Sequence, residues 1–328
     1  MESAMKMARQ YYMELSPQEP KRINFIAREG SYHGTTLGSL SMSGHVARRS
    51  LFLDLLLPNI AKVSACNPYR GMMVGQTTEE YVVQLADELD RKFQDLGPDT
   101  VCAFVAEPVV GAFSHNIMSG ITCTNGRMQT LGCVPAVPGY FKAMKSVCDK
   151  YGALLIFDDA ESFFNETADV FTEVMSGMGR SGTLHAWQQE HVVPDIQTIA
   201  KGLGAVTRQW LQMLLKMELA KGLSLMGTPT KATQSALEVQ RIIREEELVS
   251  NVQKQGVILE KLLRKYLDDH PYVGNIRGKG LFWGVSQRNL LRICVVWLTI
   301  SVYRLNLSMT KRAKGRSHDQ QISLTKFT

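Results

Sequence analysis

The sequence predicts an α/β fold in which helices cover both faces of a mostly parallel sheet. Three unbroken apolar runs read as buried strands: Thr100 to Ala106, Ala153 to Phe157 and Ile196 to Ala200. A helical segment, Tyr140 to Tyr151, separates the first two of these runs. Strands that are apolar along their whole length are typical of parallel sheets, because both faces of such sheets are buried.

The remaining elements follow from the spacing of apolar residues along the chain. They are a helix over residues 4–12, a strand over 22–27, a charged amphipathic helix over 78–93, a long helical stretch over 234–267 and a strand, R-G-K-G-L-F-W-G-V, over 277–285. We expect the long helical stretch to bend at Gly256. The last two elements predict a smaller α+β domain near the C-terminus.

The length of 328 residues suggests two domains, and 45% hydrophobic with 21% charged residues is an ordinary globular composition. We place a large domain at 1–231, a small domain with its linking helix at 232–288, and an atypical basic tail at 289–328. From Arg304 onward the chain has six Lys or Arg residues and one acid, Asp319, which accounts for most of the net charge of +6. The near-neutral body gives no argument for binding nucleic acid.

The six cysteines form no C-x-x-C pair and have no histidine partner at metal-binding spacing. We therefore expect a reducing compartment and no metal site. The longest apolar run, Ile293 to Tyr303, has 11 residues and is too short to cross a membrane. The predicted location is the cytoplasm, with the mitochondrion left open.

Two charged residues stand at the ends of predicted strands, where parallel sheets bind ligands. Asp158 ends the strand L-L-I-F-D, and Lys201 lies between the apolar run D-I-Q-T-I-A and the glycines of G-L-G. Pyridoxal phosphate chemistry needs these two groups: an amine that bonds the cofactor aldehyde and a carboxylate that keeps the pyridine nitrogen protonated. The alternatives are a surface lysine and an aspartate that only caps a strand.

Longer motifs show a resemblance to a known family. The runs C-A-F-V-A-E-P-V-V-G, G-Y-F-K-A-M-K and M-S-G-M-G-R-S-G-T-L-H-A-W-Q-Q-E occur in this order. With S-Y-H-G and I-A-K-G-L-G, they make the chain similar to class III (omega-type) aminotransferases, and most of all to fungal members. The resemblance implies the large domain of a fold-type I pyridoxal-phosphate transferase, a homodimer, and small-molecule amino donors and carbonyl acceptors.

The resemblance also assigns roles to individual residues. Lys201 matches the Schiff-base lysine, and Asp158 matches the partner of the pyridine nitrogen. Tyr32, which would stack on the pyridine ring, and its neighbour His33 match cofactor contacts, with a packing role as the alternative for His33. Val174 is the valine expected beneath the ring, although the interruption at 159–172 displaces it from the family position. Thr228 is a nearby candidate for the threonine that contacts the cofactor phosphate, whose own position is occupied by Leu225. Glu107 matches a glutamate on the substrate side, with a structural salt bridge as its alternative. Arg277 is expected to brace the C-terminal strand.

Some stretches depart from the family pattern. The phosphate-binding loop that precedes the first helix in relatives has no counterpart, and residues 113–130 and 159–172 read as insertions between family segments. We therefore expect an incomplete or mis-spliced version of the family enzyme. Three functions stay open at this point: an aminotransferase, an inactive remnant that only dimerises, and a pyridoxal-phosphate decarboxylase or aminomutase.

Overall fold

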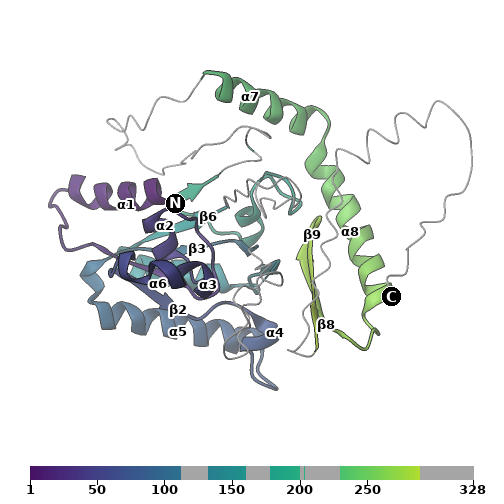
Figure 1. Ribbon diagram of the computed structural model, residues 1–328, viewed down its shortest axis with the longest axis horizontal. Coiled ribbons are helices and arrows are strands. Elements are labelled where there is room, and N and C mark those ends of the chain that lie inside the picture. Colours follow the sequence, from purple (N-terminus) through teal and green to yellow (C-terminus); the bar gives the residue numbers. More distant parts are fainter. Residues whose placement is uncertain (112–131, 160–177, 200–202, 204–229, 289–328) are drawn as a thin grey trace, which may run out of the picture. The chain divides into compact units, whose positions relative to one another are not determined.

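A parallel sheet of five strands, in the order β2-β1-β3-β6-β7, is the largest sheet that the computed structural model describes (Figure 1). The strands are β1 (Asn24–Arg28), β2 (Ile60–Val63), β3 (Val101–Ala106), β6 (Leu154–Asp158) and β7 (Ile196–Thr198). The structure describes residues 1–111, 132–159, 178–199, 203 and 230–288. All of them lie within one compact unit, Met1–Val296. The predicted α/β fold with a parallel sheet is confirmed; the predicted domain boundaries stay predictions.

Helices and short strands surround the sheet. The α-helices are α1 (Glu2–Glu14), α2 (Leu37–Met42), α3 (Val46–Arg49), α4 (Pro68–Gly71), α5 (Thr78–Leu96), α6 (Tyr140–Lys150), α7 (Thr230–Glu245) and α8 (Leu248–Leu267). The 3-10 helices are η1 (Ser50–Leu55), η2 (Pro98–Thr100) and η4 (Ala186–Glu190). Two antiparallel pairs complete the described elements: β4 (Val109–Val110) with β5 (Val134–Pro135), and β8 (Val273–Lys279) with β9 (Phe282–Gln287).

The two faces of the sheet are covered by different helices. In β3, Phe104 joins the hydrophobic cluster formed with α5 and α6, whereas Val105 joins the cluster formed with α1. This follows from strand geometry, since successive side chains point to opposite faces. Leu89 and Phe93 of α5 are completely buried, and each such burial contributes about 1.5–3 kcal/mol. Burial on both faces explains why the strands are apolar throughout.

Helix α5 has clear signals at both ends. The Thr77 hydroxyl accepts from the Glu80 amide at 3.2 Å, and the Glu80 carboxylate accepts from the Thr77 amide at 2.9 Å. This capping box satisfies amides that the first helical turn leaves unpaired. Gly97, with φ 87°, ends the helix. The helix therefore starts where the sequence predicts and runs three residues further.

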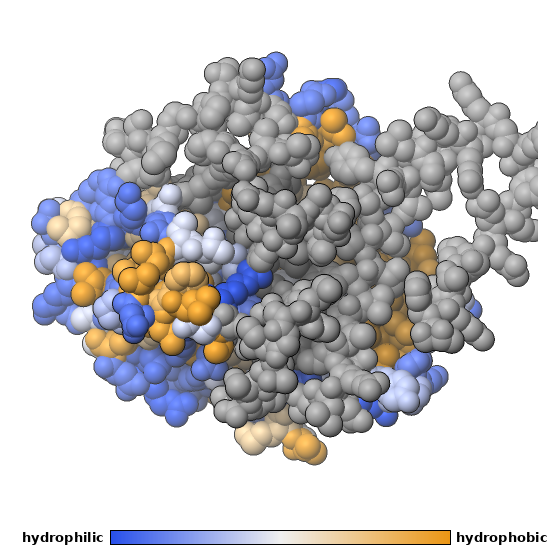
Figure 2. Space-filling view, in the orientation of Figure 1, coloured by the Kyte–Doolittle hydropathy of each residue, from blue (hydrophilic) through white to orange (hydrophobic). Residues whose placement is uncertain are grey.

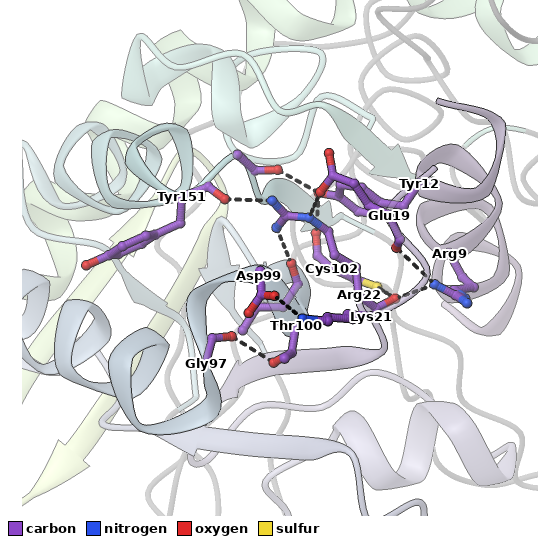
Figure 3. Close-up of polar contacts among 12 residues, drawn as sticks. Arg9, Tyr12, Glu19, Lys21, Arg22, Gly97, Asp99, Thr100, Cys102 and Tyr151 are labelled. Carbon is purple, nitrogen blue, oxygen red and sulfur yellow. Dashed lines mark hydrogen bonds and ion pairs between the residues drawn. The ribbon is translucent and has the colours of Figure 1, made fainter. Parts of the chain in front are cut away.

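A buried polar network fastens α1 to the amino ends of the strands (Figure 3). The Tyr12 hydroxyl lies 2.9 Å from the carbonyl oxygens of both Cys102 and Gly152. Arg22 lies over the Tyr12 ring, at 4.7 Å, and donates to the Val101 carbonyl at 2.7 Å. Burial raises the pKa of the Tyr12 hydroxyl, so it stays protonated and able to donate. The network anchors the amino end of the sheet and leaves the carboxyl end for other contacts.

The expected bend of the 234–267 stretch at Gly256 is wrong. The chain breaks between α7 and α8, where Glu247 takes a left-handed conformation with φ 49°. Gly256 lies inside α8, which continues through it. A Cβ on Gly256 would come within 2.6 Å of the Gly280 carbonyl oxygen, so glycine is needed there for close approach of the turn and not for a bend.

The predicted single strand over 277–285 is also wrong, because this sequence forms a hairpin. Strand β8 ends at Lys279, Gly280 and Leu281 make the turn, and β9 returns antiparallel to it. Gly280 has φ 57°, a conformation that glycine adopts without strain. The Trp283 indole donates to the Gly280 carbonyl at 2.7 Å and holds the turn. The sequence hides this turn because Gly280 is followed directly by apolar residues.

Arg277 braces this hairpin as expected. Its guanidinium donates to the Gly132 carbonyl at 2.9 Å, to the Ser286 hydroxyl at 2.6 Å and to the Asn275 side chain at 3.1 Å. Among the described residues, no helix is long and apolar enough to cross a membrane.

Candidate active site

The candidate site is centred on the Asp158 carboxylate, at the carboxyl end of β6. The Thr198 hydroxyl donates to one carboxylate oxygen at 2.5 Å, and Nδ1 of His33 lies 2.7 Å from the other. All three side chains are buried. They meet because β1, β6 and β7 run parallel, so their carboxyl ends share one edge of the sheet. The structure thus brings together two predicted residues, Asp158 and His33, with one that the sequence did not indicate.

His33 contributes hydrogen bonding without charge. Burial lowers the pKa of the His33 imidazole, and this outweighs the bond to Asp158, which raises it. A carboxylate oxygen accepts, so the single proton of the neutral ring lies on Nδ1 and points to Asp158. Nε2 is then an acceptor, and it is buried without a hydrogen-bond partner among the described residues. The ring therefore orients the carboxylate without neutralising it.

Tyr32 lies in the loop that follows β1, and this loop is tied down on both sides. The His33 amide donates to the Ser43 hydroxyl at 2.8 Å, and the Gly44 amide donates to the Ser31 carbonyl at 2.9 Å. A Cβ on Gly44 would come within 2.4 Å of a backbone nitrogen, so the approach requires glycine. The buried Tyr32 ring has the Arg48 guanidinium 4.5 Å from its centre. Its stacking on a cofactor stays a prediction.

Glu107 follows β3 at the same edge of the sheet and is buried. Its backbone carbonyl accepts from the buried Arg28 side chain at 2.5 Å. Its carboxylate favours the charged form of Lys62 on β2. The residue is thus correctly placed among the strand ends, while its predicted role toward a substrate is untested.

Comparison with known proteins decides the family. The family model described as aminotransferase class-III matches residues 1–124 and 128–293, which is most of the chain.

The chain belongs to the class III aminotransferase family.

Relatives of the class III family occur in fungi and bacteria. An aminotransferase from Gibberella zeae is 57% identical over 298 residues, covering 87% of this chain and 52% of the relative. The uncharacterized aminotransferase YodT of Bacillus subtilis is 32% identical, covering 87% of this chain and 58% of the relative. The omega transaminase from Pseudomonas jessenii, solved in complex with PMP, is 29% identical with a TM-score of 0.69, covering 87% of this chain and 58% of that one. The chain spans little more than half the length of these relatives.

Three predicted site residues lie outside the described residues: Lys201, Val174 and Thr228. Their roles stay predictions from the resemblance to the class III family. Asp158, His33, Tyr32 and Glu107 are described and all lie near the carboxyl edge of the sheet.

A second polar layer lies behind Asp158, and the sequence did not indicate it. The Gln197 side-chain amide lies 2.9 Å from Nδ1 of His185 and donates to the Asp159 carboxylate at 3.3 Å. The Asp159 amide donates to the Thr198 carbonyl at 3.1 Å. Asp159 is the first residue of the expected 159–172 insertion, yet it is buried and bonded to β7. These hydrogen bonds hold the backbone of β7 at Thr198 in position.

Thr198 is the most informative residue that the sequence reading missed. It is a polar side chain in the strand D-I-Q-T-I-A, and its exposed fraction is 0%. A buried hydroxyl requires a partner, and the nearest strand end along the sheet carries Asp158. That reasoning was possible once the order β6-β7 was assumed, but the sequence does not give strand order.

The described donors fit the pyridine end of pyridoxal phosphate. Holding a protonated ring nitrogen requires a carboxylate that keeps its negative charge in a fixed position. Thr198 and His33 supply two neutral donors, which orient Asp158 and leave its charge in place. The donor set is therefore the right chemistry for the cofactor of the class III family.

Proposed function

We propose that the chain is a pyridoxal-phosphate-dependent aminotransferase, which moves an amino group from a donor to an oxo acid or aldehyde in two ping-pong half-reactions. The observation that carries the proposal is the buried Asp158 carboxylate, held by Thr198 and His33 in a chain of the class III family. A strand-end cap would need no such pair of donors on both oxygens.

The cofactor, when bound, supplies a ring that accepts the electrons of the substrate bond being broken. Asp158 would hold the proton on the pyridine nitrogen. His33 and Thr198 would keep the Asp158 oxygens in place, and Tyr32 would supply a flat ring for stacking. By its match to the family motif, Lys201 would bind the cofactor and move the proton at the substrate carbon.

Burial strengthens the proposed role of Asp158. The exposed fractions of Asp158, His33 and Thr198 are 3%, 3% and 0%. Charges attract more strongly where water is excluded, since the effective dielectric constant falls from about 80 to about 4–20. A protonated pyridine nitrogen would therefore be stabilised more by this carboxylate than by an exposed one.

Visible absorption of the purified chain with added pyridoxal phosphate tests the proposal. We expect a cofactor band that disappears in Lys201→Ala and weakens in Asp158→Asn, with amino transfer from at least one amino acid donor. Asp95→Asn is a matched control, because Asp95 is an exposed residue of α5. No band in the unaltered chain would favour the inactive remnant. A band accompanied by carbon dioxide release, or by an amino shift within one substrate, would favour the decarboxylase or the aminomutase.

We also propose that the chain forms a homodimer through an apolar surface on η1. Leu51, Leu53 and Leu55 are 86%, 59% and 61% exposed. Hydrophobic atoms also gather on the face shown in Figure 2, which is the face of α2 and α3 in Figure 1. Contiguous exposed apolar surface is typical of protein interfaces. Light scattering of the unaltered protein should give twice the mass of one chain. The double variant Leu51→Glu and Leu53→Glu should give the mass of a single chain. Val83→Glu, on the exposed surface of α5, is the control and should remain a dimer.

A further inference from the structure

Four basic side chains lie together beside the candidate site, at the β2 side of the sheet edge. His45, Arg48 and Arg49 belong to one turn, since the Arg49 amide donates to the His45 carbonyl at 3.3 Å. Residues three and four apart on a helical turn share a face. Lys62 stands near the end of β2, and its ammonium donates to the Met42 carbonyl at the end of α2. We call these four residues the cationic cluster.

His45 has hydrogen-bonding capacity that no other described residue uses. The side chain has an exposed fraction of 0%, and neither ring nitrogen has a hydrogen-bond partner in another residue of the described part of the chain. Burial, helped by the Arg48 charge, lowers the pKa of His45 to about 4, so at neutral pH the ring has one donor and one acceptor. Nε of Arg49 is likewise buried without a partner in the part of the chain that the structure describes. Buried polar groups in proteins are nearly always paired, so these donors indicate a place for a ligand atom.

The charges around the cluster favour an anion. Burial and the Arg49 charge lower the pKa of Lys62 to about 7, while Glu29 and Glu107 act in the opposite direction. Among the individual charges that act on Lys62, that of Arg49 has the largest effect, and it disfavours a second positive charge beside it. A bound anion would relieve this repulsion, and arginine with its planar fork is the side chain best suited to a carboxylate.

The cluster adjoins the ring predicted to stack on the cofactor. Arg48 lies 4.5 Å from the centre of the Tyr32 ring. The turn that carries His45 begins at Ser43 and Gly44, which are bonded to the Tyr32 loop through the His33 amide and the Ser31 carbonyl. Lys62 also acts electrostatically on His33. An anion held by the cluster would thus lie next to the candidate active site.

We propose that the cationic cluster binds the carboxylate of the amino donor or oxo-acid acceptor, with Arg49 and His45 as the principal donors. The assignment of this carboxylate to a substrate rests on the proposed aminotransferase function. The cluster would make the enzyme prefer amino and oxo acids to uncharged amines and aldehydes.

Binding of butyrate to the whole chain, with butyramide as the uncharged probe of equal size, tests the proposal directly. Calorimetry gives the dissociation constants. The NMR signal of the His45 ring proton reports the place of binding, and it is assigned because it disappears in His45→Gln. We expect butyrate to shift this signal and to bind at least about tenfold more weakly to Arg49→Gln, with Arg49→Lys between the two. Arg241→Gln on exposed α7 should bind as the unaltered chain does.

Equal binding of butyrate and butyramide would overturn the proposal, as would unchanged butyrate affinity in both Arg49 variants. If one variant fails to fold, the other still decides. In the amino-transfer assay, Arg49→Gln should raise KM for an oxo acid about tenfold and leave KM for an aldehyde unchanged. Butyrate binding without any amino transfer would refute the proposed function and leave the carboxylate site standing. Transfer to oxo acids with an unchanged KM would refute the site and leave the function standing.

Discussion

Replacing Thr198 by valine removes the hydroxyl that holds Asp158 while keeping the shape of the side chain. The lost bond, 2.5 Å long, joins two buried groups, one of them a carboxylate. Hydrogen bonds to charged groups contribute about 1.5–3 kcal/mol, and a buried acceptor left unsatisfied adds to the cost of losing one. We therefore expect Thr198→Val to lower the free energy of unfolding by about 2 kcal/mol.

The same change should also weaken cofactor binding, because Asp158 would lose one of the two donors that the structure describes on its carboxylate. Urea unfolding measures the stability, and the visible absorption titration with pyridoxal phosphate measures the affinity, which we expect to fall by about tenfold, or about 1.4 kcal/mol. Thr198→Ser, which keeps the hydroxyl, should recover most of that affinity.

Thr100→Val provides the matched control for this experiment. Thr100 lies at the opposite end of the sheet, where its hydroxyl accepts from Asn24 at 2.8 Å and contacts the Leu96 carbonyl at 2.9 Å. Its loss should cost about 1 kcal/mol of stability and leave cofactor affinity unchanged. The reasoning is refuted if Thr198→Val binds the cofactor as tightly as the unaltered chain, or if Thr100→Val weakens binding equally.

Three further perturbations test other parts of the structure. Tyr12→Phe removes a buried hydroxyl that contacts two carbonyls and should cost about 1–2 kcal/mol in urea unfolding, whereas Tyr11→Phe should change stability by less than about 0.5 kcal/mol. Gly256→Ala places a Cβ 2.6 Å from the Gly280 carbonyl oxygen and should lower the thermal midpoint, at a cost of about 1–3 kcal/mol in stability. Alanine favours helices more than glycine does, so a more stable variant would contradict the close approach. Lys62 has a pKa of about 7 in the folded chain and its ordinary value near 10.5 in the unfolded chain. Between these two pH values the unfolded chain holds a proton on Lys62 that the folded chain has lost. The free energy of unfolding should therefore rise with pH over this range. Lys62→Met should remove that part of the slope, at most about 1.4 kcal/mol per pH unit, when urea unfolding is compared at pH 7.5 and 9.5; an unchanged slope would show that Lys62 titrates normally.

The sequence predicted the parallel sheet because its buried strands are unbroken apolar runs that can be recognised without knowing their neighbours. The runs ending at Ala106 and Asp158 are apolar on both faces, and the structure places helices on both faces. The start of α5 was readable from the polar residues that cap it. Strand β2, by contrast, is short and contains Lys62, which is usual for an edge strand and hides its apolar pattern.

The errors arose where tertiary contacts decide the conformation. R-E-E-E-L reads as continuous helix, and no residue type there signals the left-handed Glu247 that separates α7 from α8. Gly256 looked like a hinge because glycine is a poor helix former. Glycine is required at position 256 because the Gly280 carbonyl, which is distant in sequence, lies too close for a side chain. For the site, Asp158 and His33 were accessible through motifs, whereas Thr198 required knowledge of which strands are neighbours.

Three cationic side chains at the carboxyl edge of the sheet contact groups other than the Asp158 carboxylate. Arg28 donates to the Glu107 carbonyl, Arg48 lies on the Tyr32 ring, and Lys62 donates to the Met42 carbonyl. Two of the groups that contact the Asp158 oxygens are neutral, because His33 is uncharged at neutral pH and Thr198 supplies a hydroxyl.

This separation of charge suits a reaction that handles two charged groups at once. A protonated pyridine nitrogen needs an anion beside it, and a substrate carboxylate needs cations at a distance from that anion. If Arg48 or Lys62 paired with Asp158, that cation would compensate the negative charge needed by the pyridine nitrogen and would be less available to a substrate carboxylate. Under the proposed function, the β6 end of this edge would hold the cofactor's pyridine nitrogen and the β2 end would hold the substrate carboxylate, while the neutral His33 and Thr198 side chains keep Asp158 in position.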